Sequence, residues 1–149
     1  EAQECDRLVE VRTIFVPTAE AIVAMNKYIC EQGGNPHHCN SIDKVESAIH
    51  SAFYPGSYPF AHGGIPRIAG ALCFYLLKSH AFTDGNKRTG ALAAITFLNQ
   101  HGLDLQYPID IENDVDGLAE IVDACAASRI DRDQLMEWFD LHKAYVDEE

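Results

Sequence analysis

The chain has 149 residues, of which 47% are hydrophobic and 23% charged, and this ordinary composition favours one folded domain over residues 1–149 with a core at about 16–145. The net charge of −12 argues against nucleic acid and against an anionic membrane surface as partners, because both attract clustered Lys and Arg. The five cysteines form no C-x-x-C pair, and neither a signal peptide nor an apolar run of about 18 residues is visible, so we expect free thiols and a cytoplasmic protein.

Apolar residues at helical spacing predict an all-α fold. Glycines and prolines separate the helices, while Ser41 and Asp131 stand where they can cap the helices that follow them. The loop Gly102–Pro108 carries one short extended stretch. In chain order, the predicted elements are a strand at Val11–Val16 and helices at Thr18–Gln32, Ile42–Phe53, 65–79, Lys87–His101, Asn113–Ala127 and Asp131–Tyr145.

The segment at about 54–65 interrupts the helical pattern with prolines, glycines and aromatic residues. It could be a plain connector. It could also be a flap, such as a β-hairpin, that holds a binding partner. Its candidate contact residues are Tyr58, Phe60, Gly63 and Gly64.

The most informative stretch of the chain is His80-Ala-Phe-Thr-Asp-Gly-Asn-Lys-Arg88, which stands between two apolar helical patterns. Gly85 can take backbone conformations closed to other residues, so the chain can curl around an anion. The backbone N–H groups of Gly85, Asn86 and Lys87 could then form a concave nest at a helix start. Arg88 carries a planar fork of donors suited to phosphate. The stretch therefore predicts a phosphate-binding loop.

Two further residues of the same stretch carry reactive chemistry. A neutral imidazole, such as that of His80, can take a proton from an attacking hydroxyl. Asp84 offers the kind of oxygen ligand that Mg²⁺ takes beside phosphate oxygens. Phe82 would anchor the loop in the core.

Each of these residues has a plainer interpretation. Asp-Gly-Asn is common turn chemistry, and a lone His or a pair of cations is more often structural or solvated than functional. The joint pattern favours a site, because a turn needs no base before it and no Arg after it. His37-His38-Cys39 with Cys30 could bind a metal, although the spacing fits no structural zinc pattern.

The stretch resembles the signature of the Fic/Doc family, H-P-F-x-[D/E]-G-N-[G/K]-R. It departs from the signature at Ala81, where the family usually has Pro, a residue that stiffens the loop and carries no reactive group. The segment 54–65 resembles the flap of this family, and the short C-terminal helical part resembles Doc proteins. The resemblance implies a helical Fic/Doc domain and covers about residues 16–145. The matching residues are His80, Phe82, Asp84, Gly85, Asn86, Lys87 and Arg88.

The resemblance also implies roles for these residues, with ATP as co-substrate. His80 would be the general base acting on a Ser, Thr or Tyr hydroxyl of a target protein, and Asp84 would bind Mg²⁺. Gly85 and Asn86 would form the anion hole, and Arg88 would hold a nucleotide phosphate. The flap would hold the target segment beside the His.

Lys87 bears on the reaction. Most Fic enzymes have Gly there and transfer AMP, whereas Doc proteins have Lys and include a toxin kinase that phosphorylates translation elongation factor Tu. The resemblance thus favours transfer of the γ-phosphoryl group of ATP to a protein hydroxyl. AMP transfer by the same site and a non-catalytic nucleotide- or partner-binding module are the alternatives.

Some members of this family carry an inhibitory helix with the string Ser/Thr-x-x-x-Glu-[Gly/Asn]. Glu112-Asn113 has Pro108 where the hydroxyl residue would stand, and no other such string is present. The resemblance therefore implies restraint by a separate antitoxin-type chain with a Glu that reaches Arg88.

Overall fold

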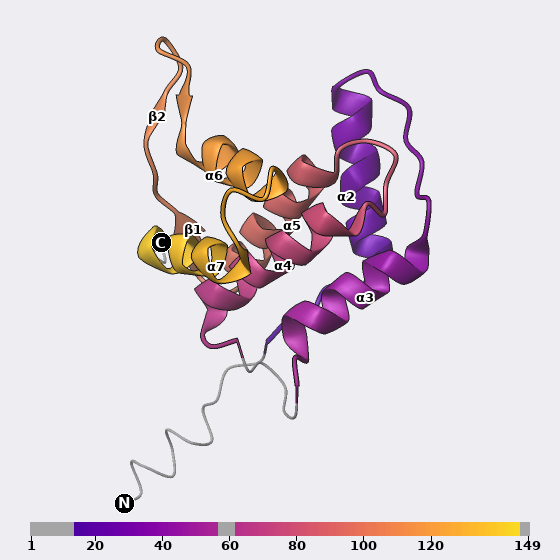
Figure 1. The fold of residues 1–149 in the computed structure, drawn as a ribbon, viewed down its shortest axis with the longest axis horizontal. Helices are drawn as coiled ribbons and strands as arrows, with labels where there is room; N and C mark the ends of the chain where they lie inside the picture. The colour runs from indigo at the N-terminus through magenta and orange to yellow at the C-terminus, as the bar shows by residue number, and fades with distance from the viewer. Residues whose placement is uncertain (1–13, 57–61, 147–149) are drawn as a thin grey trace, which may run out of the picture.

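A computed structural model describes residues 14–56 and 62–146, and these residues are mostly helical, which confirms the all-α prediction (Figure 1). Within the described ranges, two small antiparallel strand pairs accompany the helices. The helices of the described residues are α2 (Ala19–Gln32), α3 (Ile42–Phe53), α4 (Ile65–Ser79), α5 (Asn86–Gln100), α6 (Gly117–Ala126) and α7 (Arg132–Leu141).

Helix α4 lies at the centre of the fold, with α3, α5 and α7 packed around it (Figure 1). Two glycines permit this close packing. A Cβ added at Gly90 of α5 would lie 2.9 Å from the backbone oxygen of Cys73 in α4, and one added at Gly70 of α4 would lie 2.7 Å from Cα of Met136 in α7. Cβ atoms do not approach other atoms so closely, so these glycines set the distances between the helices. The C-terminal end of α4 therefore belongs to a helix that is firmly packed against its neighbours.

Three of the predicted helix starts are confirmed by their caps. The hydroxyl of Thr18 accepts a hydrogen bond from the N–H of Ala21 at 3.1 Å, and that of Ser41 accepts one from Lys44 at 3.3 Å. Asp131 and Gln134 form the expected capping box at the start of α7. These side chains satisfy amide groups that have no partner within the helix.

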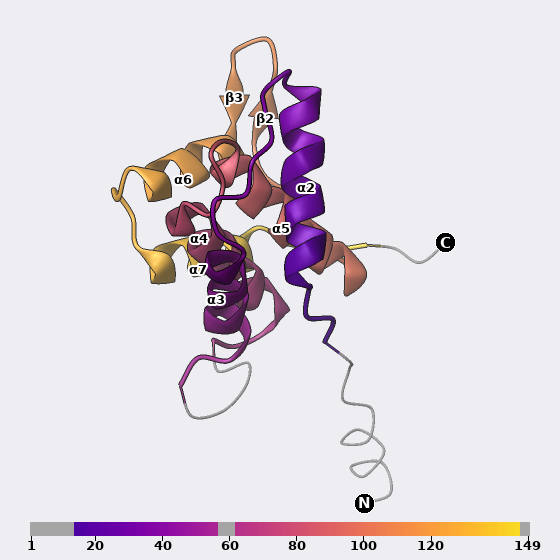
Figure 2. The same ribbon diagram turned by 90° about the vertical axis from the view of Figure 1, so that its right-hand side faces the viewer.

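The strands are short. Two of them form a local hairpin, and the other two pair although they are far apart in the sequence. Strand β1 (Leu103–Leu105) pairs antiparallel with β4 (Lys143–Tyr145). Strand β2 (Ile109–Asp110) pairs antiparallel with β3 (Val115–Asp116), and this hairpin projects from the helices (Figure 1 and Figure 2). The extended stretch expected within 102–108 is thus β1.

Two predicted helix boundaries are wrong, and the described part of one predicted strand is not a strand. The helix predicted from Asn113 starts only at Gly117, because Asp114 takes a left-handed conformation in the hairpin turn and Asp116 caps α6. The helix predicted to Tyr145 ends at Leu141, because Lys143–Tyr145 pairs with β1. Residues 14–16 form no strand, and the rest of the predicted strand at 11–16 lies outside the described residues.

Two of the cysteines expected to be free thiols, Cys73 and Cys125, are fully buried in the core and unpaired. Burial raises the pKa of both thiols above the usual value. Across residues 14–56 and 62–146, none of the helices combines the length and the apolar character needed to cross a bilayer.

Candidate active site

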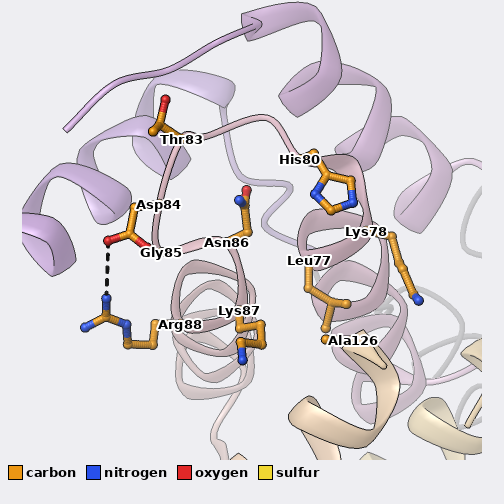
Figure 3. A pocket seen from close by; sticks show the side chains of 10 residues that line it. All are labelled: Leu77, Lys78, His80, Thr83, Asp84, Gly85, Asn86, Lys87, Arg88 and Ala126. Carbon is orange, nitrogen blue, oxygen red and sulfur yellow. Dashed lines mark ion pairs between the residues drawn. The ribbon is translucent and has the colours of Figure 1, made fainter. Parts of the chain in front are cut away.

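A cavity of about 390 Å³ opens where α4 ends and α5 begins (Figure 3). The loop between the two helices, residues 80–85, is called the motif loop below. The cavity brings together seven residues that are close in sequence and three that the sequence did not single out. It is lined by Leu77, Lys78, His80, Thr83, Asp84, Gly85, Asn86, Lys87, Arg88 and Ala126.

His80 is the residue that ends α4. Its backbone is left-handed, with φ of 54°, and its side chain is exposed at the edge of the cavity (Figure 3). The two residues after it are buried, and Phe82 is only 3% exposed, which confirms that Phe82 anchors the loop in the core. An uncommon conformation for a non-glycine residue thus presents the imidazole to solvent while the following residues hold the loop.

Gly85 stands immediately before the first turn of α5. Its φ of 80° favours glycine, and a Cβ there would also lie 3.0 Å from Nδ2 of Asn26. The amides of Asn86, Lys87 and Arg88 open the helix, where no carbonyl one turn earlier in the helix can accept from them. With the positive end of the helix dipole, these amides make the wall of the cavity suited to an anion.

The side chain of Asn86 closes the motif loop. Its Nδ2 donates to the carbonyl of Phe82 at 2.8 Å, and its Oδ1 accepts from the N–H of Phe82 at 3.1 Å. These two hydrogen bonds tie the side chain of Asn86 to the backbone of Phe82 and so close the motif loop. The side chain of Asn86 therefore holds the loop, and its backbone amide is the group available to an anion.

Asp84 and Arg88 face each other at the side of the cavity away from His80 (Figure 3). The shortest distance between the carboxylate and the guanidinium is 4.0 Å, and the two side chains are 46% and 54% exposed. Such an exposed pair contributes little to stability, so either group can turn to a ligand at small cost. Asp84 lines the cavity, and a carboxylate is a kind of oxygen ligand that Mg²⁺ takes beside phosphate oxygens.

Lys87 turns toward α6. Its Nζ lies 3.0 Å from Oδ1 of Asp123. Lys87 also lines a second, mostly apolar cavity of about 360 Å³ between α5 and α6, together with Leu118 and Val122. The ammonium group of Lys87 therefore turns from the motif cavity toward Asp123.

The described part of the predicted flap lies at the end of α4 that is away from the motif cavity. Gly64 precedes α4 and His80 ends it, and the 15 residues of α4 span about 22 Å. Gly63 and Gly64 therefore lie at the opposite end of α4 from His80, and the docking of a target segment on this flap stays a prediction. Tyr58 and Phe60 lie outside the described residues, as does most of the hairpin considered there.

A different segment lies beside the motif loop. Residues 33–41, called the pairing loop below, connect α2 to α3 and form an antiparallel bridge between Cys39 and Phe82. The N–H of Thr83 donates to the carbonyl of His38 at 3.1 Å, and the N–H of Asn40 donates to that of Ala81 at 2.7 Å. This pairing was not predicted, because nothing local in the sequence signals a contact between such distant segments.

The metal site considered at His37-His38-Cys39 with Cys30 is not formed. His37 Nδ1 is hydrogen-bonded to Oδ1 of Asn26 at 2.9 Å. No three or more His, Cys, Asp or Glu side chains gather around a metal-sized space anywhere in residues 14–56 and 62–146.

Asn26 is the residue that sequence reasoning missed most clearly. It is fully buried in α2 and donates to the carbonyl of Asp84 at 2.8 Å. It lies on the same face as Ile22 and Ile29. A polar residue in an apolar stripe must find hydrogen-bond partners when buried, so the signal was present in the sequence.

Two comparisons with known proteins bear on this cavity. The model of the family described as "Fic/DOC family" matches residues 17–98, more than half of the 149 residues and including the whole motif loop. The chain is also similar to "Toxin Doc" of Mycolicibacterium smegmatis, with 42% identity over 53 residues. That match covers 36% of this chain and 41% of the relative, so the chain spans about two-fifths of the relative's length.

Proposed function

Because the chain belongs to the Fic/DOC family, we propose that the motif cavity transfers the γ-phosphoryl group of ATP to a hydroxyl of a target protein, as a Doc-type toxin kinase. The observation that carries this proposal is the convergence of His80, Asp84, Arg88 and the start of α5 on one cavity. Its composition matches what phosphoryl transfer needs, which is positioning and charge neutralisation around a phosphate.

In the proposed reaction, His80 accepts the proton of the attacking Ser, Thr or Tyr hydroxyl. The hydroxyl oxygen forms a bond to the γ-phosphorus, the bond from that phosphorus to the β–γ bridging oxygen breaks, and ADP leaves. The first-turn amides of α5 and the guanidinium of Arg88 hold the phosphates. Asp84 would hold Mg²⁺, which neutralises phosphate charge.

AMP transfer by the same cavity is the second candidate, and one observation keeps it open. The ion pair between Lys87 and Asp123 draws the ammonium group toward α6. Lys87 therefore does not by itself prevent ATP from binding in the reverse orientation, in which the α-phosphate and not the γ-phosphate lies beside the hydroxyl.

The same geometry supports a proposal for the partners. We propose that the target segment docks against the pairing loop, because that loop is hydrogen-bonded to the residues next to His80. A separate antitoxin-type chain would place a carboxylate at Arg88 and the start of α5, in competition with phosphate. ATP as co-substrate and the four free thiols among the described cysteines fit a cytoplasmic location.

The test uses ATP labelled at the α- or the γ-phosphate, with Mg²⁺ and a bacterial lysate as the source of target protein. Protein labelling from the γ-position alone is the expected result. Labelling from the α-position would replace the proposal by AMP transfer. If neither label reaches protein while ATP still binds, the cavity is a binding module. Adding a candidate antitoxin chain should weaken nucleotide binding, and unchanged affinity would contradict the proposed competition.

A further inference from the structure

A single buried amide joins four parts of the structure around the motif loop. Asn26 of α2 is fully buried, and its Nδ2 donates to the carbonyl of Asp84 at 2.8 Å and to Oγ1 of Thr89 in α5 at 3.0 Å. Its Oδ1 faces Nδ1 of His37 in the pairing loop at 2.9 Å, and the Cys30 thiol at 3.7 Å. The donors and the acceptor of this amide are therefore all engaged.

These contacts fix the orientation of the amide. The carbonyl of Asp84 can only accept, so the NH₂ group of Asn26 must face it and Oδ1 must face His37. It follows that Nδ1 of His37 carries the proton of that hydrogen bond. Without His37, Oδ1 would retain the long contact with the Cys30 thiol as its remaining partner among the described residues.

The amide also sets the position of the anion-binding turn. Gly85 leaves room for Nδ2 of Asn26, which a Cβ there would approach to 3.0 Å. Thr89, whose N–H donates to the carbonyl of Gly85 at 2.8 Å, is fully buried and shares the same Nδ2. Asn26 thus holds, from the buried side, the backbone of Asp84 and the start of α5.

We propose that Asn26 is a positioning residue for the reaction, and that His37 controls it from the pairing loop. The pair His37–Asn26 transmits the position of the pairing loop to Asp84 and to the first turn of α5. A protein segment that docks on the pairing loop would in this way order the phosphate-binding turn. This inference rests on the proposed function for its catalytic consequence and on the hydrogen bonds alone for its structural one.

The test substitutes His37, which is only partly buried, because removal of Asn26 from the core could unfold the protein. His37→Ala removes the donor to Oδ1. His37→Asn restores an N–H donor near the position of Nδ1. The matched control is His38→Ala, since the side chain of His38 is exposed and forms no hydrogen bond to another of the described residues.

The first measurement is amide hydrogen exchange of Phe82, Thr83 and Thr89, which needs no activity. His37→Ala should speed exchange at these amides roughly 2- to 10-fold, the effect of losing one hydrogen bond, with little change in α6 and α7. His37→Asn and His38→Ala should exchange like the unaltered protein. Equal exchange in His37→Ala and His38→Ala would overturn the coupling.

The second measurement is the kinetics of label transfer. His37→Ala should lower kcat about 2- to 10-fold with a change in the KM for ATP of less than about twofold, and His37→Asn should recover the rate. An unchanged kcat in His37→Ala would overturn the catalytic part of the inference. If the unaltered protein transfers no label, the proposed function fails, and the exchange data still decide whether His37 and Asn26 order the turn.

Discussion

The ammonium group of Lys87 lies 3.0 Å from the carboxylate of Asp123, so a residue that lines the motif cavity is tied to helix α6. Both side chains are more than half exposed. An ion pair of this kind contributes about 0–1 kcal/mol to stability, because solvent screens it. The pair can therefore open when an anion enters the cavity, and Asp123 competes with that anion for the cation.

Replacing Asp123 should release Lys87 to the cavity. We expect Asp123→Asn to tighten ATP binding by up to about fivefold, in keeping with the small strength of an exposed pair. Isothermal titration calorimetry at low salt measures it. Glu120→Gln is the control, because Glu120 is an exposed carboxylate of the same helix that is not paired with Lys87. Equal affinities of the two variants would show that Asp123 has no specific effect.

The loop-closing side chain of Asn86 should matter for both stability and transfer. Asn86→Ala removes the two hydrogen bonds to Phe82, so we expect the free energy of unfolding to fall by about 1–3 kcal/mol and label transfer to fall with it. Urea denaturation measures the first effect. Asn99→Ala, an exposed change on the same helix, should stay within about 0.5 kcal/mol of the unaltered protein. A stable Asn86→Ala variant would mean that the ring of hydrogen bonds does not hold the loop.

The contact between α4 and α5 should tolerate no added methyl group. Gly90→Ala would place Cβ against the backbone oxygen of Cys73, and we expect a loss of about 1–3 kcal/mol in the free energy of unfolding. Gly64→Ala is the control, because its Cβ would meet nothing closer than 3.8 Å and its φ is −75°. It should cost less than about 1 kcal/mol in thermal or urea unfolding. Similar losses for the two variants would contradict the close packing.

The stability of the protein should depend on the protonation of His62. Burial lowers the pKa of His62 below 6.5, although its Nε2–H donates to the carbonyl of Ser51 at 3.1 Å. Because the unfolded chain then binds this proton more readily, the free energy of unfolding should fall as pH drops below about 6.5 and be unaffected above it. His62→Gln should flatten that slope in urea titrations between about pH 5 and 7, whereas His38→Gln should leave it unchanged. If the pH dependence of the free energy of unfolding persisted in His62→Gln, it would come from groups other than His62.

The parts of the fold that depend on neighbouring residues were predictable. Thr18 and Ser41 cap the helices that apolar spacing predicted, and the helices before and after the motif start and end within one residue of expectation. The same holds for the motif cavity, because its chemically important residues are contiguous in sequence and a helix C-terminus, a glycine and a helix N-terminus fold them locally.

The errors come from contacts between distant residues. Lys143–Tyr145 continues a helical pattern but pairs with Leu103–Leu105, so the strand ladder outweighs local propensity. The hydrogen bonds of residues 33–41 to Ala81 and Thr83 were not predicted either, because nothing local in the sequence signals them. Asn26 was passed over because spacing alone does not show which buried carbonyl an amide will meet.

The central claim, that the motif cavity is catalytic and His80 is its base, is tested most directly by comparing His80→Ala with the unaltered protein in two assays. The assays are the transfer of labelled phosphate to a target protein and the affinity for ATP with Mg²⁺. We predict a loss of transfer of about 10²- to 10⁴-fold with ATP affinity largely kept, since the base acts on the hydroxyl and not on the nucleotide. Transfer by His80→Ala at a rate near that of the unaltered protein would contradict the account.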